Sequence, residues 1–126
     1  MERAPARRFQ ELLVWQKAHQ LTLAVYRASE AFPKHELFAL TSQLRRAAVS
    51  VPANIAEGFR KRGIKDKIRF FNIAEGSLEE AHYYFILAQD LGYANTKSLT
   101  EQANEVGRLL EAYGQAMRTK LTTPNS

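Results

Sequence analysis

Four stretches of the chain carry apolar residues at alternating spacings of three and four, the pattern of an amphipathic α-helix. No stretch alternates with a period of two, so no strand is predicted. The flanking residues 1–10 and 121–126 lack periodicity, which predicts a basic arm and a frayed tail. The predicted helices cover residues of about 11–31, 36–62, 65–91 and 96–120.

Proline and glycine mark the ends of these helices. Pro33 closes the first helix, Gly63 ends the second, and Gly92 is placed to cap the third. Pro52 falls inside the second helix, where it removes one backbone hydrogen bond at a cost of about 3 kcal/mol. Because the apolar spacing continues in phase across Pro52, we expect a kink there, with Ser50 as a partner for the freed backbone.

Four helices joined by short loops are typical of an antiparallel up-down four-helix bundle. The third predicted helix has two adjacent apolar stripes instead of one. This helix is therefore either central in the bundle or covered by another subunit.

The fold-back between the second and third helices predicts which residues meet. If the chain turns at residues 63–64, Ser50 lies near Gly76 and Ser77, and these small residues let the two helices approach closely. The same register brings the arginine pair that opens the second helix to a glutamate pair on the third. We therefore expect a partly buried ion pair between Arg45 or Arg46 and Glu79 or Glu80.

Composition restricts the class of protein. The 126 residues are 45% apolar and 25% charged, which is typical of one globular domain. The absence of cysteine excludes disulfides, thiolate metal sites and cysteine nucleophiles. No apolar run approaches the roughly 18 residues of a membrane span, and no apolar signal core follows the basic N-terminus. We expect a cytoplasmic protein that makes no membrane contact.

The net charge of +5 is concentrated in a basic run between the second and third helices. Over residues 60–69 this run is opposed only by Asp66. It is either a solvated helix end or a patch that contacts phosphate groups, and Arg3, Arg7 and Arg8 of the arm would add to such a patch. The aromatic residues nearby have core spacing, so we expect binding with little sequence readout. The candidate residues are Arg60, Lys61, Arg62, Lys65, Lys67 and Arg69.

Catalytic patterns are lacking. A di-iron bundle needs two Glu-x-x-His motifs, but Glu79 and His82 form a single one. No nucleophile, base and orienting group suggest a triad, and no glycine-rich phosphate loop is present. Glu57 is better explained as a structural carboxylate than as a general base. We therefore expect no enzyme activity, no catalytic residue, no metal and no cofactor.

Three strings carry a family resemblance: LLVWQKAHQL, FPKHELFALTSQLRRAAVSVPANIAEGFRK and FFNIAEGSLEEAHYYFILAQDLGY. Together they resemble the bacterial four-helix-bundle proteins encoded by intervening sequences in 23S rRNA genes. The resemblance covers about residues 9–93. A related branch is the accessory protein of diversity-generating retroelements, which binds a reverse transcriptase and nucleic acid.

This resemblance implies an up-down bundle that assembles into a homopentameric ring, and it brings no catalytic residue. The matching motif positions are interpreted as packing and interface residues. They are Arg45, Arg46, Ser50, Pro52, Asn54, Glu57, Gly58, Gly76, Ser77 and Glu80.

Charge and resemblance together predict a non-enzymatic accessory protein that binds nucleic acid, associated with RNA or ribonucleoprotein. The alternative is a protein-interaction scaffold, such as a subunit that binds a reverse transcriptase. In both hypotheses the chain also binds copies of itself. The sequence leaves RNA and DNA both open as the nucleic acid.

Overall fold

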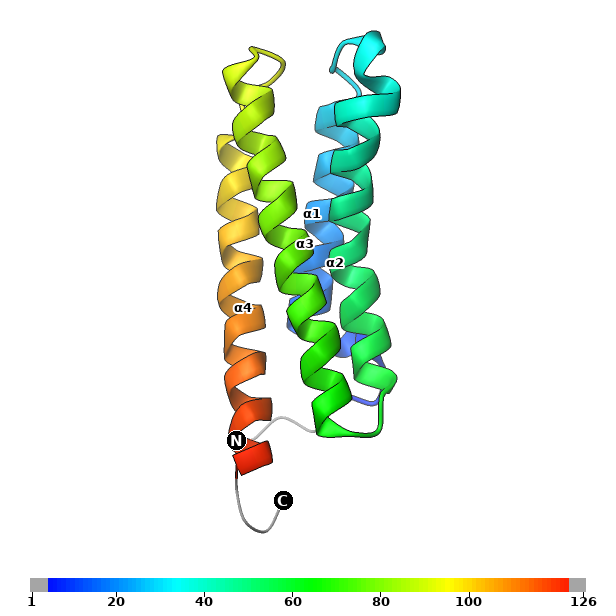
Figure 1. The fold of residues 1–126 in the computed structure, drawn as a ribbon, viewed down its shortest axis with the longest axis vertical. Coiled ribbons are helices and arrows are strands. Elements are labelled where there is room, and N and C mark those ends of the chain that lie inside the picture. Colours follow the sequence, from blue (N-terminus) through cyan, green and yellow to red (C-terminus); the bar gives the residue numbers. More distant parts are fainter. Residues whose placement is uncertain (1–4, 123–126) are drawn as a thin grey trace.

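A computed structural model describes residues 5–122 of the chain. In this part of the chain four long helices pack side by side and no strand forms (Figure 1), so the predicted all-α class is confirmed. The helices are α1 (Leu13–Ser29), α2 (Ser42–Arg60), α3 (Ile64–Asp90) and α4 (Lys97–Thr122). Three short turns, η1 (Phe9–Glu11), η2 (Lys34–Glu36) and η3 (Leu37–Thr41), precede α1 or α2.

One face of each helix is buried in a shared core. The buried positions recur at the predicted spacings of three and four, so the apolar pattern identified the core faces correctly. No helix within residues 5–122 is long and apolar enough to cross a membrane. The largest fully buried side chains are Phe85, Leu21, Leu44, Ile55, Leu110, Val14, Val25, Val51 and Val106.

The segment before α2 differs from the predicted helix, which was expected to begin near residue 36. A 3₁₀ turn and a π-helical turn occupy residues 34–41, and Ala39 departs from helical dihedral angles (φ −123°, ψ −105°). The carboxylate of Glu36 accepts a hydrogen bond from the backbone N–H of Leu40 at 3.4 Å. The spacing of apolar residues could not indicate this change, because Leu37, Leu40 and Leu44 suit either geometry.

Pro52 lies inside α2, which continues from Ser42 to Arg60. Because proline has no N–H, the carbonyl of Ala48 lacks its usual helical donor. The buried hydroxyl of Thr22 on α1 shares its single proton between that carbonyl oxygen, at 3.1 Å, and the carbonyl oxygen of Ala18 in its own helix, at 2.9 Å. A side chain of a neighbouring helix therefore offers the carbonyl of Ala48 a shared donor in place of the bond that Pro52 removes, and Ser50 does not. The kink expected at Pro52 stays a prediction.

The contacts between α2 and α3 follow the predicted register. The hydroxyl oxygens of Ser50 and Ser77 lie 2.7 Å apart, and the hydroxyl oxygen of Tyr84 lies 2.9 Å from the side-chain amide oxygen of Gln43. Residue numbers thus fall along α2 as they rise along α3, so the two helices run in opposite directions. The predicted proximity of Ser50 and Ser77 is confirmed.

Gly58 provides the closest approach between α2 and α3. A Cβ atom at this buried glycine would lie 2.9 Å from Cβ of Phe70 and 3.1 Å from the ring of Phe71. A contact of 2.9 Å essentially never occurs at a real Cβ atom, and Cβ of Phe70 is too close to the backbone to move aside, so alanine would require α2 and α3 to shift.

Gly76 does not have the packing role that the sequence suggested. It is exposed, and an added Cβ would meet no atom of another residue within 4 Å. Successive helix residues point about 100° apart. Since Ser77 faces α2, Gly76 is turned away from it, and the prediction that Gly76 lies in this contact is wrong.

The predicted ion pair between α2 and α3 is also wrong. The guanidinium of Arg45 lies over the ring of Tyr26 on α1, 4.8 Å from its centroid, and donates to the hydroxyl of Ser29 at 2.8 Å. Arg46 is exposed, and no arginine pairs with Glu79 or Glu80 among the described residues. Arg45 therefore joins α2 to α1.

The C-terminal end of α3 is capped as predicted. Gly92 has a positive φ of 78°, a conformation that glycine adopts without strain. The N–H groups of Gly92 and Tyr93 donate to the carbonyls of Gln89 and Ala88, which satisfies the end of the helix. The turn then leads into α4, where the hydroxyl of Thr96 donates to the carbonyl of Phe85 at 2.8 Å.

Candidate nucleic-acid interface

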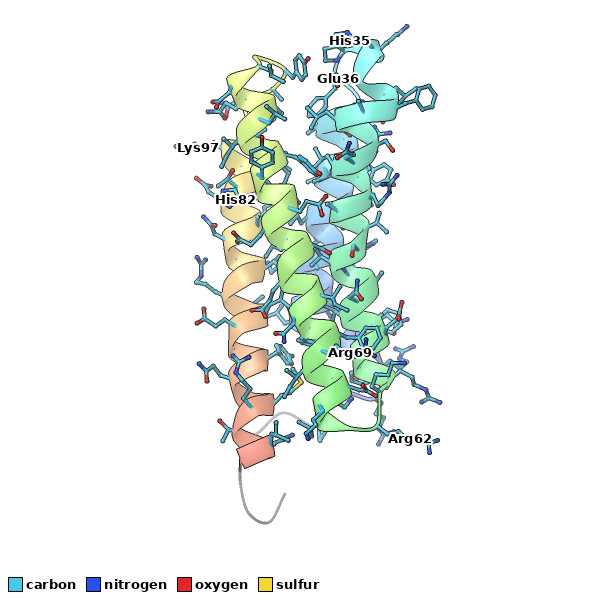
Figure 2. All side chains as sticks on the ribbon, viewed as in Figure 1. His35, Glu36, Arg62, Arg69, His82 and Lys97 are labelled. Atoms are coloured by element: carbon cyan, nitrogen blue, oxygen red, sulfur yellow. The ribbon has the colours of Figure 1, made fainter. Side chains whose placement is uncertain are left out.

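The basic run lies at the end of the bundle where α2 turns into α3. Arg62 and Arg69 project there, at the opposite end from His35 and Glu36 (Figure 2). The turn is tight because Lys61 is extended directly after α2, and α3 begins three residues later. Arg60, Arg62 and Lys65 are exposed and take part in none of the ion pairs within residues 5–122. They are the cations of the run best placed to meet phosphate groups.

Two cations of the run stack on one aromatic ring. The ammonium group of Lys61 lies 4.9 Å from the centroid of Phe70, and the guanidinium of Arg69 lies 4.7 Å from it. Arg69 also approaches the carboxylate of Asp66 at 3.7 Å. These contacts hold both side chains close to α3 and occupy the Phe70 ring, so this aromatic is not free to stack on a base.

Lys67 has a structural partner in α2. Its ammonium group donates to the carbonyl of Phe59 at 2.6 Å and to that of Gly58 at 3.3 Å. Burial lowers the pKa of Lys67, and repulsion from Lys120 lowers it further. The end of α2 leaves the carbonyl of Phe59 without a helical donor, and Lys67 supplies one from the next helix. The carbonyl of Gly58 accepts both from Lys67 and from the backbone N–H of Lys61 at 3.2 Å. Of the six predicted phosphate contacts, this one is better explained as a helix cap.

Substitution of Lys67 tests whether this residue caps α2 or is an exposed cation that can contact phosphate. We expect Lys67→Ala to lower the free energy of unfolding by about 1 kcal/mol, because two carbonyls lose a charged donor. The matched variant Lys65→Ala removes an exposed charge of the same run and should change stability by less than about 0.5 kcal/mol. Urea unfolding of the two variants measures the difference; equal stabilities would show that Lys67 caps nothing.

The fold brings further basic residues to this end of the bundle. Lys120, in the last turn of α4, lies close enough to Lys67 to affect its pKa. The arm contributes Arg7 and Arg8, which are both exposed and precede the turn η1 that packs against α2. Arg3 lies outside the described residues. Lys120 was missed by the sequence analysis because it is more than fifty residues from the basic run.

The remaining motif residues stabilise α2 and α3 or face solvent. The amide of Asn54 donates to the carbonyl of Ser50 at 2.8 Å, one turn earlier in α2. Glu80 accepts a hydrogen bond from the hydroxyl of Tyr84 at 2.7 Å, and this bond raises the pKa of Tyr84. Glu57, interpreted from the sequence as a structural carboxylate, is exposed.

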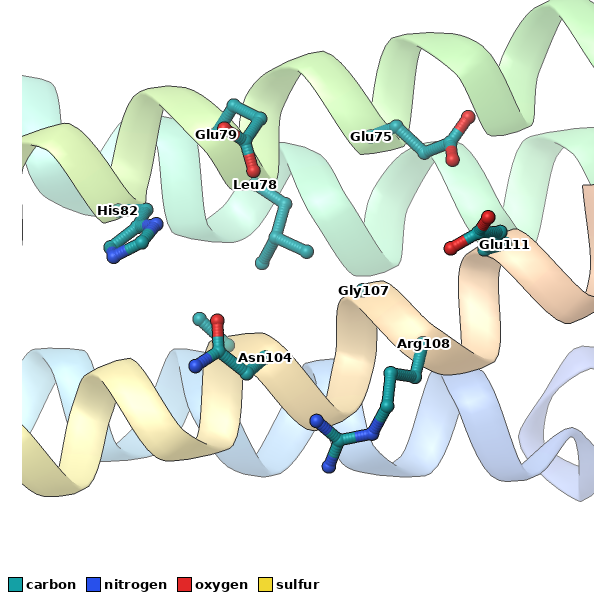
Figure 3. Close-up of a pocket in the computed structure, with 9 residues that line it drawn as sticks. Glu75, Leu78, Glu79, His82, Asn104, Gly107, Arg108 and Glu111 are labelled. Carbon is teal, nitrogen blue, oxygen red and sulfur yellow. The ribbon is translucent and has the colours of Figure 1, made fainter.

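A groove of about 400 Å³ separates α3 from α4 (Figure 3). Its α3 wall carries Glu75, Glu79 and His82, and its α4 wall carries Arg108 and Glu111. No group of three or more histidine or acidic side chains suited to a metal ion occurs within residues 5–122. The groove therefore presents a mixed, mainly acidic surface, which contrasts with the basic end of the bundle.

Comparison with known proteins identifies the family. The profile of the family described as 23S rRNA-intervening sequence protein matches residues 10–112. A comparison with curated proteins gave no match. The matched segment includes all of α1, α2 and α3, most of α4, and the basic turn. The chain therefore belongs to the 23S rRNA-intervening sequence protein family.

Proposed function

We propose that this protein is a non-enzymatic accessory factor that binds nucleic acid through the basic end of its bundle. The observation that carries the proposal is the exposure of Arg60, Arg62 and Lys65 beside the charge of Lys120. Clustered cations attract phosphate groups and release the counterions bound to them, which favours association. The rings of Phe59 and Phe70 at this end are covered by cations, so the contacts are to the backbone and not to bases.

RNA, alone or within a ribonucleoprotein, is the nucleic acid that we favour, and the cytoplasm is the expected compartment. Membership of the 23S rRNA-intervening sequence protein family supports the choice of RNA. A blunt basic end contacts phosphates without entering a groove, so affinity should follow charge density more than sequence.

We also infer that the helices form an up-down bundle, with α2 bent at Pro52, and that several bundles assemble into a ring. Support comes from the opposite directions of α2 and α3 and from apolar side chains left on the surface. A ring would multiply the basic end, and several weak phosphate contacts made together bind far more tightly than one. The family resemblance suggests five copies.

Neutralising the basic end should weaken RNA binding and its dependence on salt. We expect Arg60→Gln, Arg62→Gln and Lys65→Gln together to lower affinity for a short structured RNA. The slope of log K against log salt should fall by about 2–3, since each lost phosphate contact removes about 0.7–0.9. Fluorescence anisotropy at several salt concentrations measures both quantities.

The matched control removes the same charge from the other end of the bundle. Arg27→Gln, Lys34→Gln and Lys97→Gln substitute three exposed cations there and should leave the slope unchanged. Equal effects of the two triple variants would mean that net charge, and not the basic end, attracts RNA. Complete absence of RNA binding would favour the scaffold alternative, in which a partner such as a reverse transcriptase contacts the nucleic acid.

A further inference from the structure

Two surfaces of the bundle expose apolar side chains that no described residue of the same chain covers. The first is an outward stripe of α3, formed by Gly76, Glu79, Tyr83, Ile86 and Asp90. The second is a hollow of about 520 Å³ beside η3, lined by Tyr26, Leu37, Phe38, Arg45, Arg46 and Val49. We refer to them as the α3 stripe and the η3 hollow.

The α3 stripe is apolar at its centre. Its members follow one another at spacings of three and four, so they form a single line along the helix. Tyr83 is 57% exposed and Ile86 is 49% exposed. Gly76 continues this line, and no described atom of the chain accounts for its missing side chain. A helix-interior glycine lowers stability by about 1 kcal/mol relative to alanine, and its missing side chain leaves room here for the close approach of another backbone.

The η3 hollow carries the most exposed large apolar side chain of the described chain. Phe38 is 92% exposed because the π-helical turn directs it away from the core. Leu37 and Val49, at 47% and 41% exposed, extend the apolar surface around it. Aromatic side chains held on rigid elements are frequent anchors of protein interfaces.

The charges of the two surfaces are complementary. Carboxylates of Glu79 and Asp90 flank the apolar centre of the α3 stripe, and both residues are exposed. Guanidinium groups of Arg45 and Arg46 line the η3 hollow, and Arg45 is held in place by Tyr26 and Ser29. Opposite charges around matched apolar centres favour one partner and orientation over others.

Both surfaces lie at the same level of the bundle. The contacts of Gln43 with Tyr84 and of Ser50 with Ser77 place α2 residues 42–49 level with α3 residues 78–85. The surfaces nevertheless face different sides, since Glu79 borders the α3–α4 groove and the hollow lies between α1 and α2. A contact between two such surfaces is head-to-tail, and it repeats around a ring if the rotation closes.

We propose that the η3 hollow of one copy receives the α3 stripe of a second copy of this chain. The proposal rests on the self-association proposed above and names the two surfaces that meet. Because both surfaces lie at one level, neighbouring bundles stand parallel. Their basic ends then gather on a single face of the assembly.

Charge-introducing variants on each surface test this arrangement by light scattering. Phe38→Glu places a carboxylate near Asp90, and Ile86→Lys places an ammonium group near Arg45. Each variant should weaken association about 30-fold or more and remain monomeric where the wild type assembles. Each variant also keeps one intact surface, so an equimolar mixture should associate again through the intact stripe of one variant and the intact hollow of the other.

Controls separate loss of the interface from loss of the fold. Leu13→Glu alters an exposed apolar residue at the start of α1, far from both surfaces, and should assemble as the wild type does. Circular dichroism should show unchanged helix content in every variant. If a charged variant fails to fold, Gly76→Ala serves instead: it should weaken association while making the isolated subunit more stable.

Three results would overturn the proposal. A monomeric wild type would refute both the proposed self-association and the proposed interface. Assembly that survives both charged variants would leave the self-association standing and refute the choice of surfaces. Assembly lost in Phe38→Glu but kept in Ile86→Lys would indicate a symmetric contact between two hollows. RNA binding by the basic end is a separate question, which the two triple variants test.

Discussion

Replacing Gly58 by alanine is expected to lower the free energy of unfolding by about 1–3 kcal/mol. The added methyl group would meet Cβ of Phe70 at 2.9 Å, and an atom so close to the backbone cannot turn away. α2 and α3 would have to separate, and this loss outweighs the gain of about 1 kcal/mol in helix propensity. Urea unfolding followed by circular dichroism gives the change directly.

Gly76→Ala is the matched control, because the two glycines follow the same tripeptide Ile-Ala-Glu in neighbouring helices. With open space around its Cβ, alanine at position 76 should raise the stability of the isolated subunit by about 1 kcal/mol. The two substitutions should thus have opposite signs. Destabilisation of similar size by both would refute the difference in packing between the two sites.

Removing the hydroxyl of Thr22 is the second substitution expected to have a large effect. Thr22→Val keeps the shape of the side chain but leaves the carbonyl of Ala48 buried without a donor. We expect the free energy of unfolding to fall by about 1–3 kcal/mol, the usual penalty for such a group. Thermal and urea unfolding of the variant measure this penalty.

A double-mutant cycle tests whether the lost donor to the carbonyl of Ala48 causes the destabilisation by Thr22→Val. In the Pro52→Ala background, the backbone N–H restored at position 52 can donate to the carbonyl of Ala48, so Thr22→Val should then change stability by less than about 1 kcal/mol. The coupling between the two sites is the quantity of interest. If Thr22→Val is equally harmful in both backgrounds, the hydroxyl does not serve the carbonyl that Pro52 leaves open.

The fold class and the core could be predicted because they depend on a periodic property of the sequence. Apolar residues at spacings of three and four determine which face of each helix is buried, whatever the partner helix. The turn η3 could not be predicted, because its apolar residues suit an α-helix equally well. The role of Thr22 could not be predicted either, since it depends on a residue of another helix.

The candidate site was predicted in part, for a similar reason. Charge clustering along the sequence located the basic end of the bundle, but it could not assign tasks to individual cations. Lys67 and Lys65 are the same residue type in the same run, yet Lys67 contacts carbonyls at the end of α2 and Lys65 faces solvent. Lys120 joins the site only because α4 ends beside the α2–α3 turn.

The hydrogen bond between Thr22 and Ala48 also restricts how α1 and α2 can align. Apolar seams that repeat every turn would still match after one helix slides along the other by about 5.4 Å. Such a slide would carry Thr22 away from the carbonyl of Ala48, which Pro52 leaves without its helical donor in the interior of α2. Pro52 thereby marks one position along an otherwise repetitive surface, and it penalises misaligned packings that the hydrophobic core alone would tolerate.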